Sequence, residues 1–194
     1  LTIFRPIPSQ SDLHLKARLE TIDASPKRAL LSQSFRTEDD QGALCIDAEM
    51  RVIVRLGGRE TSASAKRKTA ASVPDTAKTI GTATLGPNAG LDFACLTGDF
   101  NPIHWLPPFA KMAGFGRPIL HGFGSLAIAV ERLHSSVWSK VTHRPRWIDV
   151  RFTRPLKLPN DVAVFICDER IWVADKQGKK IFLDGQFGIL TGEQ

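Results

Sequence analysis

One segment of this chain, residues 123–138, has the spacing of apolar side chains that is typical of a long helix. A chain with a single long helix must bury the apolar face of that helix against other elements, so this segment constrains the fold strongly. The residues that recur at helical intervals, and that we expect to face the core, are Leu126, Ala127, Val130, Leu133 and Val137.

Most of the remaining chain has patterns typical of strands, and residues 12–19 alternate with a strict period of two. Turn signals separate the strands at Ser25-Pro26, residues 39–42 and residues 176–178. A short helix is predicted at residues 109–113. The predicted strands are 12–19, 29–35, 44–54, 80–85, 147–152, 162–167, 170–174 and 180–190. We therefore predict an α+β fold, with an antiparallel sheet wrapped around one long central helix.

The chain contains a weak internal repeat. Residues 5–7 and 12–15 align without a gap on residues 154–156 and 161–164, with Arg-Pro and Asp repeated. The repeat predicts a partial unit of strands at 1–58 and a complete unit at 80–194, although chance agreement between two β-rich segments stays open. The first unit would lack the long helix and expose an apolar face, which we expect a missing part of the chain or a partner chain to cover.

Residues 59–79 join the two predicted units and are rich in Ser, Thr, Ala and Lys. This composition predicts a flexible linker with few packing contacts. The alternative is a basic clamp for a phosphate group at Lys66-Arg67-Lys68.

The net charge of +6 is typical of a solvated basic surface; the alternative is that it attracts a polyanionic ligand that carries phosphates. The basic residues are scattered and accompany no nucleic-acid motif, so we expect no nucleic-acid partner. No apolar run approaches the ~20 residues of a membrane span, and we expect no membrane association. The three cysteines have no metal-ligand or redox spacing, which indicates reduced thiols in a cytoplasmic protein, with Cys95 buried.

Two groups able to transfer protons, Asp99 and His104, stand five positions apart in a segment interrupted by Gly98 and Pro102. Gly98 permits an unusual backbone angle, and Asn101-Pro102 is typical of a cap followed by a first helical position. A carboxylate and an imidazole on such a turn suit paired acid–base work on one small molecule such as water.

Gly122 opens the long helix. The first amides of a helix have free N–H groups at the positive end of the helix dipole, and a residue without a side chain lets a carbonyl oxygen approach closely. This position could therefore stabilise an enolate-like oxygen.

These residues resemble a known family. The chain is similar to the hydratase-2, or MaoC-like dehydratase, family over about residues 82–190, in the pattern Phe93-x-x-Leu96-Thr97-Gly98-Asp99-x-Asn101-Pro102-Ile103-His104-x5-Ala110 and in Gly114-Phe115 and Pro118-Ile119-Leu120-His121-Gly122. The resemblance implies the hot-dog fold, here as an incomplete double hot dog.

The resemblance also implies a reaction, the reversible hydration of a trans-2-enoyl-CoA to an (R)-3-hydroxyacyl-CoA. Asp99 would be the base on a water, His104 would hold the water and carry the second proton, and Asn101 would orient it or cap its own helix. The Gly122 amide would bind the thioester oxygen. No metal or cofactor beyond the coenzyme A carrier is expected, and we expect a homodimer.

Four further residues are candidates for binding the substrate. Phe93, Phe115 and Phe123 would line an acyl channel or belong to the core, and His121 would cap the long helix or pack beneath the motif loop. Two other functions stay open. One is dehydration of 3-hydroxyacyl groups on acyl carrier protein, with docking at Arg144, Arg146 and Arg151; the other is a non-catalytic acyl-thioester-binding subunit.

Overall fold

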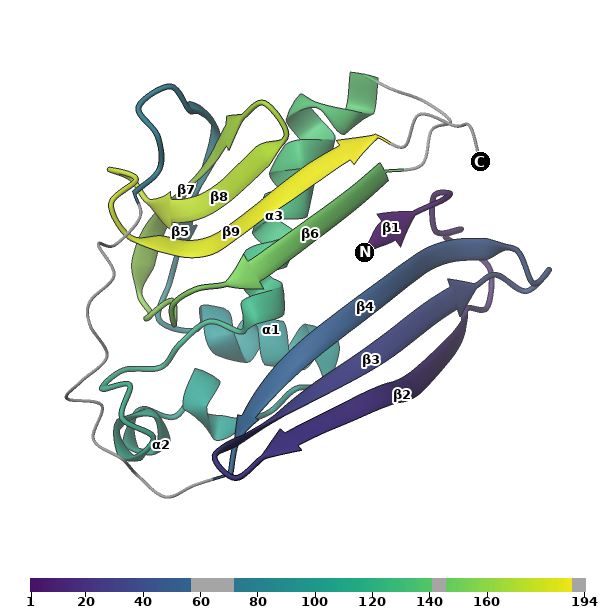
Figure 1. Cartoon of the computed structure of the whole chain (residues 1–194). Coiled ribbons are helices and arrows are strands. Elements are labelled where there is room, and N and C mark those ends of the chain that lie inside the picture. The colour runs from purple at the N-terminus through teal and green to yellow at the C-terminus, as the bar shows by residue number, and fades with distance from the viewer. Residues whose placement is uncertain (57–71, 141–145, 190–194) are drawn as a thin grey trace. The chain divides into compact units, whose positions relative to one another are not determined.

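The structure is a computed structural model that describes residues 1–56, 72–140 and 146–189 (Figure 1). The described residues form two compact units. Those of the first unit fall within Leu1–Lys68, His143–Ile148 and Gly188–Gln194, and those of the second within Thr69–Thr142 and Asp149–Phe187. The predicted division of the chain at residues 58 and 80 stays a prediction.

The first unit is an antiparallel sheet. Its strands are β1 (Thr2–Ile3), β2 (His14–Ser25), β3 (Arg28–Glu38) and β4 (Leu44–Arg55), in the order β2-β3-β4-β1. The start of β6 (Arg146–Phe152) pairs with β1, with Thr2 opposite Trp147. The predicted hairpin loop before β4 is confirmed: Gly42 has φ 77° and donates its N–H to the carbonyl of Asp39.

The register of the first unit collects its apolar residues on one face. Leu15 lies opposite Thr37, Leu19 opposite Gln33 and, after a bulge, Ile22 opposite Leu31. Leu15 is 64% exposed and Ile22 is 59% exposed. A sheet with one apolar face normally buries that face against another element, so this face could be covered by another segment or chain. The expectation that another segment or chain covers it stays a prediction.

The second unit combines a sheet with helices. Its strand order is β6-β9-β8-β7-β5. Its strands include β5 (Lys78–Leu85), β7 (Asn160–Cys167), β8 (Arg170–Asp175) and β9 (Ile181–Ile189). Its helices are α1 (Ala89–Thr97), η1 (Pro102–His104), α2 (Pro107–Met112), α3 (Gly122–Ser136) and η2 (Trp138–Lys140). Helix α3 lies against β5, β7 and β8 (Figure 1).

The core of the second unit lies between α3 and this sheet. Ala129 and Leu133 on α3 are fully buried, as are Val164, Val173 and Leu183 on the strands. The predicted antiparallel sheet around one long helix is therefore confirmed. The prediction for Ala127 is wrong, because the buried face of α3 is centred on the four-residue step from Ser125 through Ala129 to Leu133, and Ala127 lies on the exposed side.

The strand orders of the two units match. The order β2-β3-β4-β1 in the first unit has the same connectivity as β7-β8-β9-β6 in the second. Leu13 and Leu15, which align with Val162 and Val164 in the repeat, are 42% and 64% exposed, whereas both valines are fully buried. The positions that α3 helps to cover in one unit are thus uncovered in the other.

Helix α1 was not predicted from the sequence, because Gly98 and Pro102 of the motif indicated a loop. Gly98 instead ends the helix: it has φ 78° and donates its N–H to the carbonyl of Ala94, 2.8 Å away. Cys95 on α1 is exposed, so the prediction that it is buried is wrong. No helix among residues 1–56, 72–140 and 146–189 is long and apolar enough to cross a membrane.

The predicted linker lies largely outside the described residues, including the proposed clamp at residues 66–68. Its described end, from residue 72, does not fit a linker. Val73 is 8% exposed, belongs to a core cluster with Phe165 and Trp172, and donates its N–H to the carbonyl of Gly178. Strand β5 then begins at Lys78, two residues before the predicted start.

The buried face of α3 gives a stability prediction. We expect Leu133→Ala to lower the free energy of unfolding by about 2–5 kcal/mol, because a fully buried leucine leaves a cavity when it is truncated. Leu96→Ala is the matched control, since that side chain is 81% exposed, and it should change stability by less than about 0.5 kcal/mol. Urea unfolding measures both; equal losses would contradict the assigned core.

Candidate active site

The site begins at the end of α1. The left-handed conformation of Gly98 turns the chain so that Asp99 follows the helix directly. The Asn101 amide donates to Asp99 Oδ1 at 3.3 Å, and the Asp99 amide donates to Thr97 Oγ1 at 3.5 Å. The carboxylate is 58% exposed, so it keeps access to solvent.

The short helix η1 then buries the second candidate. Asn101 is its N-cap: its Oδ1 accepts a hydrogen bond from the Ile103 amide at 3.3 Å, and Pro102 occupies the first helical position. This confirms the predicted cap. His104 at the end of η1 is 9% exposed.

Three hydrogen bonds join this loop to the segment that leads into α3. The Ile119 amide donates to the Ile103 carbonyl at 3.3 Å. His104 Nδ1 lies 2.8 Å from the Ile119 carbonyl oxygen, and His121 Nε2 lies 3.0 Å from the Asp99 carbonyl oxygen. We refer to these three bonds as the clasp. It fixes both candidate proton carriers to one short stretch, residues 119–121.

The clasp determines where the imidazole protons lie. A carbonyl oxygen can only accept, so His104 Nδ1 and His121 Nε2 must each carry a hydrogen. In a neutral ring the other nitrogen is then bare. His104 therefore presents Nε2 as an acceptor. The Nδ1 atom of His121 is buried and has no hydrogen-bond partner among the described residues.

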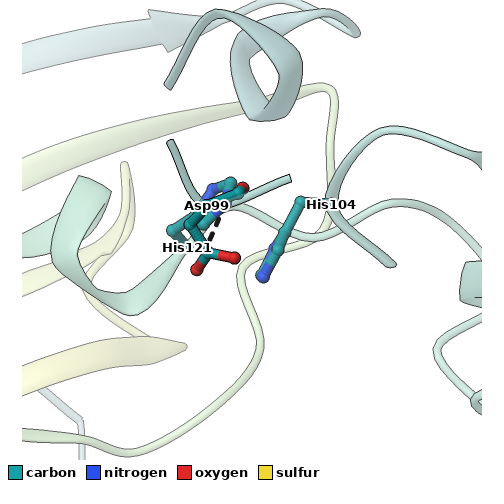
Figure 2. A group of neighbouring side chains, drawn as sticks. All are labelled: Asp99, His104 and His121. Carbon is teal, nitrogen blue, oxygen red and sulfur yellow. Dashed lines mark hydrogen bonds and ion pairs between the residues drawn. The ribbon is translucent and has the colours of Figure 1, made fainter. Parts of the chain in front are cut away.

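The two imidazole rings are stacked. Their centroids are 3.6 Å apart with 21° between the planes, and the Phe93 ring packs 5.0 Å from that of His121. Figure 2 shows the Asp99 carboxylate beside this pair. One polar atom from each of Asp99, His104 and His121 lies within 4.8 Å of the others. The predicted convergence of Asp99 and His104 is therefore observed, and a small molecule such as water could bridge the two groups.

Burial lowers the pKa of His104 below its usual value. The hydrogen bond to the Ile119 carbonyl and the charge of Asp99 act in the opposite direction, and the neighbouring His121 adds to the lowering. A lowered pKa means that the ring is neutral at pH 7 and takes a proton only below the pH at which a free histidine would. Nε2 is thus available as an acceptor at neutral pH.

Asp99, His104 and His121 are also residue types that bind metals. The hydrogen bond of His121 argues against the use of its Nε2 as a ligand. Of the two ring nitrogens of His121, Nε2 lies 3.8 Å from Asp99 Oδ2 but donates to a main-chain carbonyl, so it has no lone pair to offer a metal. The expectation of a metal-free site stays a prediction.

The structure places the other predicted residues around this group. Gly122 begins α3 directly after His121, and a side chain added there would meet the ring of Phe152 at 3.2 Å. Phe123 is 53% exposed and makes an edge contact with Phe152 at 6.0 Å. Phe115 follows α2, where its amide donates to the Ala110 carbonyl. Neither Phe115 nor Phe123 lines the pocket described next.

An open pocket of about 280 Å³ lies between α1, α3 and β5. Phe93 connects it to the site, because its ring lines the pocket and also contacts His121. Asp92 is the charged residue in its wall. The remaining lining residues are apolar or small: Leu85, Ala89, Leu96, Leu120, Gly124 and Ile128.

Two features of the site were not predicted from the sequence. The Ile119 carbonyl orients His104, and Phe152 covers Gly122. A main-chain carbonyl leaves no residue-type signal, and Phe152 lies about thirty positions from Gly122, on a different element. Neither could have been found by local spacing.

Comparison with known proteins shows the family. The sequence profile described as "MaoC like domain" matches residues 61–183, more than half of the chain, so the chain belongs to the MaoC-like domain family. It is 31% identical over 144 residues to "Enoyl-CoA hydratase 2, peroxisomal" of Arabidopsis thaliana, covering 69% of this chain and 46% of that protein. It is 27% identical over 162 residues to "Peroxisomal multifunctional enzyme type 2" of Mus musculus, covering 80% and 21%.

Solved structures support the fold. A MaoC-like dehydratase from Phytophthora capsici matches 98% of this chain and 69% of its own, with a TM-score of 0.74 and 21% identity. The full-length peroxisomal multifunctional enzyme type 2 from Drosophila melanogaster matches 96% and 35%, with a TM-score of 0.72 and 19% identity. The predicted hot-dog fold is confirmed. The chain spans half or less of the two curated relatives named above.

The close approach of α1 to η1 gives a second prediction. A side chain at Gly90 would overlap the main-chain carbonyl of His104, whereas Gly86 has open space around it. We expect Gly90→Ala to displace η1 and to lower stability by about 1–3 kcal/mol, and Gly86→Ala to leave stability nearly unchanged. Thermal unfolding compares the two variants. Equal melting temperatures would show that α1 and η1 are not packed as described.

Proposed function

We propose that this chain catalyses the reversible hydration of trans-2-enoyl-CoA to (R)-3-hydroxyacyl-CoA. The observation that carries the proposal is the grouping of the exposed Asp99 carboxylate with buried His104, one polar atom of each lying within 4.8 Å of the other. His104 Nδ1 is bonded to the Ile119 carbonyl, so Nε2 is the nitrogen that we propose to contact the water. Family membership and the likeness to a protein named as an enoyl-CoA hydratase 2 support the same reaction.

The clasp changes the roles assigned from the sequence. There, Asp99 was the base and His104 supplied a second proton. His104 carries its hydrogen on Nδ1, bonded to the Ile119 carbonyl, so its Nε2 has no proton of its own to donate. We assign the role of base to His104 Nε2, because the ordinary pKa of an imidazole lies nearer to neutrality than that of a carboxyl group. Asp99 accepts the other hydrogen of the water and orients it.

In this scheme, one proton passes through His104. The water oxygen bonds to C3 of the enoyl group as one of its protons moves to His104 Nε2. The electron pair of the C2–C3 double bond shifts toward the thioester carbonyl, which becomes an enolate. His104 then returns the same proton to C2, so water has been added and the enzyme is unchanged. Dehydration follows the reverse path.

The start of α3 is the proposed site for the enolate oxygen. The Gly122 amide is at the first turn of a 15-residue helix, where N–H groups lack helical acceptors and the helix dipole favours negative charge. Preorganised donors of this kind stabilise charge that develops in the transition state. Asn101 is assigned the structural role, since its Oδ1 already caps η1.

The pocket between α1, α3 and β5 is the proposed site for the acyl chain. Its wall is largely apolar, and Phe93 links it to His121 beside the reacting groups. Burial of methylene groups there would supply binding free energy of about 0.8 kcal/mol per group. Phe93 is therefore the member of the predicted aromatic set that we retain as substrate-binding.

The carrier-protein alternative rests on Arg144, Arg146 and Arg151. Arg144 lies outside the described residues, and no observation favours a protein carrier over coenzyme A. The non-catalytic alternative gains no support from the site, because both proton carriers converge. A homodimer, the absence of metal or other cofactor and a cytoplasmic location stay predictions.

The reaction is tested by replacing each proton carrier. We expect His104→Gln to lower hydration of crotonyl-CoA by at least about a hundredfold, because general acid–base catalysis typically contributes 10²–10⁴-fold. We expect Asp99→Asn to lower it by about a hundredfold as well, because the uncharged amide no longer holds the water in the reactive orientation. The matched control is His134→Gln, because His134 is an exposed histidine in the last turn of α3. This variant should retain wild-type rates. The assay follows loss of the enoyl absorbance and the chirality of the product.

Two results would overturn the proposal. One is a near-native rate in either the Asp99 or the His104 variant while circular dichroism shows an intact fold. The other is formation of the (S) product by the wild-type chain.

A further inference from the structure

Building on the proposed function, we infer that His121 is a positioning residue: it holds the Asp99 main chain and the His104 ring in the arrangement that receives the water. It is not itself assigned contact with the reacting atoms. This goes beyond packing beneath the motif, the role that the sequence suggested.

The first support is the bond to Asp99. The His121 side chain is 4% exposed and donates Nε2–H to the Asp99 carbonyl at 3.0 Å. The Asp99 carboxylate is 58% exposed and accepts from one main-chain amide, that of Asn101, at 3.3 Å. An exposed carboxylate is held mainly by its backbone, so a buried donor on that backbone controls where the carboxylate lies.

The second support is the stacked pair. The His121 ring lies 3.6 Å from the His104 ring, and Phe93 contacts it at 5.0 Å. His104 is therefore fixed by its bond to Ile119 and by the face of His121. Rotation of the His104 ring would break both contacts, so Nε2 keeps one direction.

The third support is the buried Nδ1 of His121. This nitrogen has no hydrogen-bond partner among the described residues, and burying an unsatisfied polar atom is unfavourable. A residue present only to fill space, such as phenylalanine, would avoid that cost. We therefore explain the presence of a histidine at position 121 by its Nε2–H donor and by its effect on the neighbouring His104 ring.

That effect is electrostatic. A charge on either stacked ring opposes a charge on the other, which acts together with burial to keep His104 neutral. The hydrogen bond to the Ile119 carbonyl and the charge of Asp99 raise the pKa of His104. The helices packed against η1 carry Asp92 on α1 and Lys111 on α2, and neither is among the groups that shift the pKa of His104.

Two substitutions separate the functions of His121. His121→Gln retains an Nε–H donor at a similar reach but removes the ring. His121→Phe retains a stacked ring but removes the donor and the titratable group. His134→Gln is again the control, on the same helix but exposed. For each variant, kcat, KM and the pH profile are measured with crotonyl-CoA, and the His104 ring is titrated by NMR.

We expect the Phe variant to lose about tenfold or more in kcat with KM changed by less than about threefold, because the Asp99 anchor is lost while the substrate pocket is intact. The Gln variant should lose less in kcat than the Phe variant. In both, the pKa of His104 should rise, and the acid limb of the pH profile should move to higher pH with it.

The inference is wrong if both variants keep the wild-type kcat, or if they lose stability while the titration of His104 stays at its wild-type position. The NMR titration does not depend on turnover. A wild-type chain that fails to hydrate enoyl-CoA would refute the proposed function, while a shifted His104 titration in the variants would still support the coupling of the two rings.

Discussion

The hydrogen bond from His104 Nδ1 to the Ile119 carbonyl is the interaction on which the proposed chemistry depends. At 2.8 Å it fixes the tautomer of the neutral ring, and so decides which nitrogen is left as a hydrogen-bond acceptor. A buried imidazole with the other tautomer would present a hydrogen where an acceptor is needed. In the proposed mechanism, the identity of the base and the return of the proton to carbon both follow from this one contact.

The fold explains why this contact is in place. Helix α1 ends at a left-handed glycine, η1 is capped by Asn101, and α3 begins at residue 122, so three element ends meet in one region of the second unit. The long helix is held against the strands by Ala129 and Leu133. The clasp therefore ties a short, irregular loop to the start of the long helix of the unit, and such support is what a preorganised site requires.

The regular parts of this arrangement could be predicted from sequence. The period of two along residues 12–19 and the apolar spacing after Gly122 specify strands and one long helix, because side-chain burial repeats with the geometry of the backbone. The Asp99 and His104 pair was equally visible, since its residue types and spacing are unusual. Helix α1 was not, because Gly98 and Pro102 mark loops and helix ends alike. The Ile119 carbonyl and Phe152 were also invisible, since their contribution depends on tertiary contact and not on local pattern.

The most direct test of this account is the tautomer of His104 in the free protein. Long-range ¹H–¹⁵N correlation spectra of ring-labelled protein above neutral pH, assigned with His104→Gln, distinguish a protonated Nδ1 from a protonated Nε2. The account predicts a hydrogen on Nδ1 and a bare Nε2. A spectrum showing the hydrogen on Nε2 would contradict it, because the Ile119 bond would then be absent and His104 could not accept a proton from water.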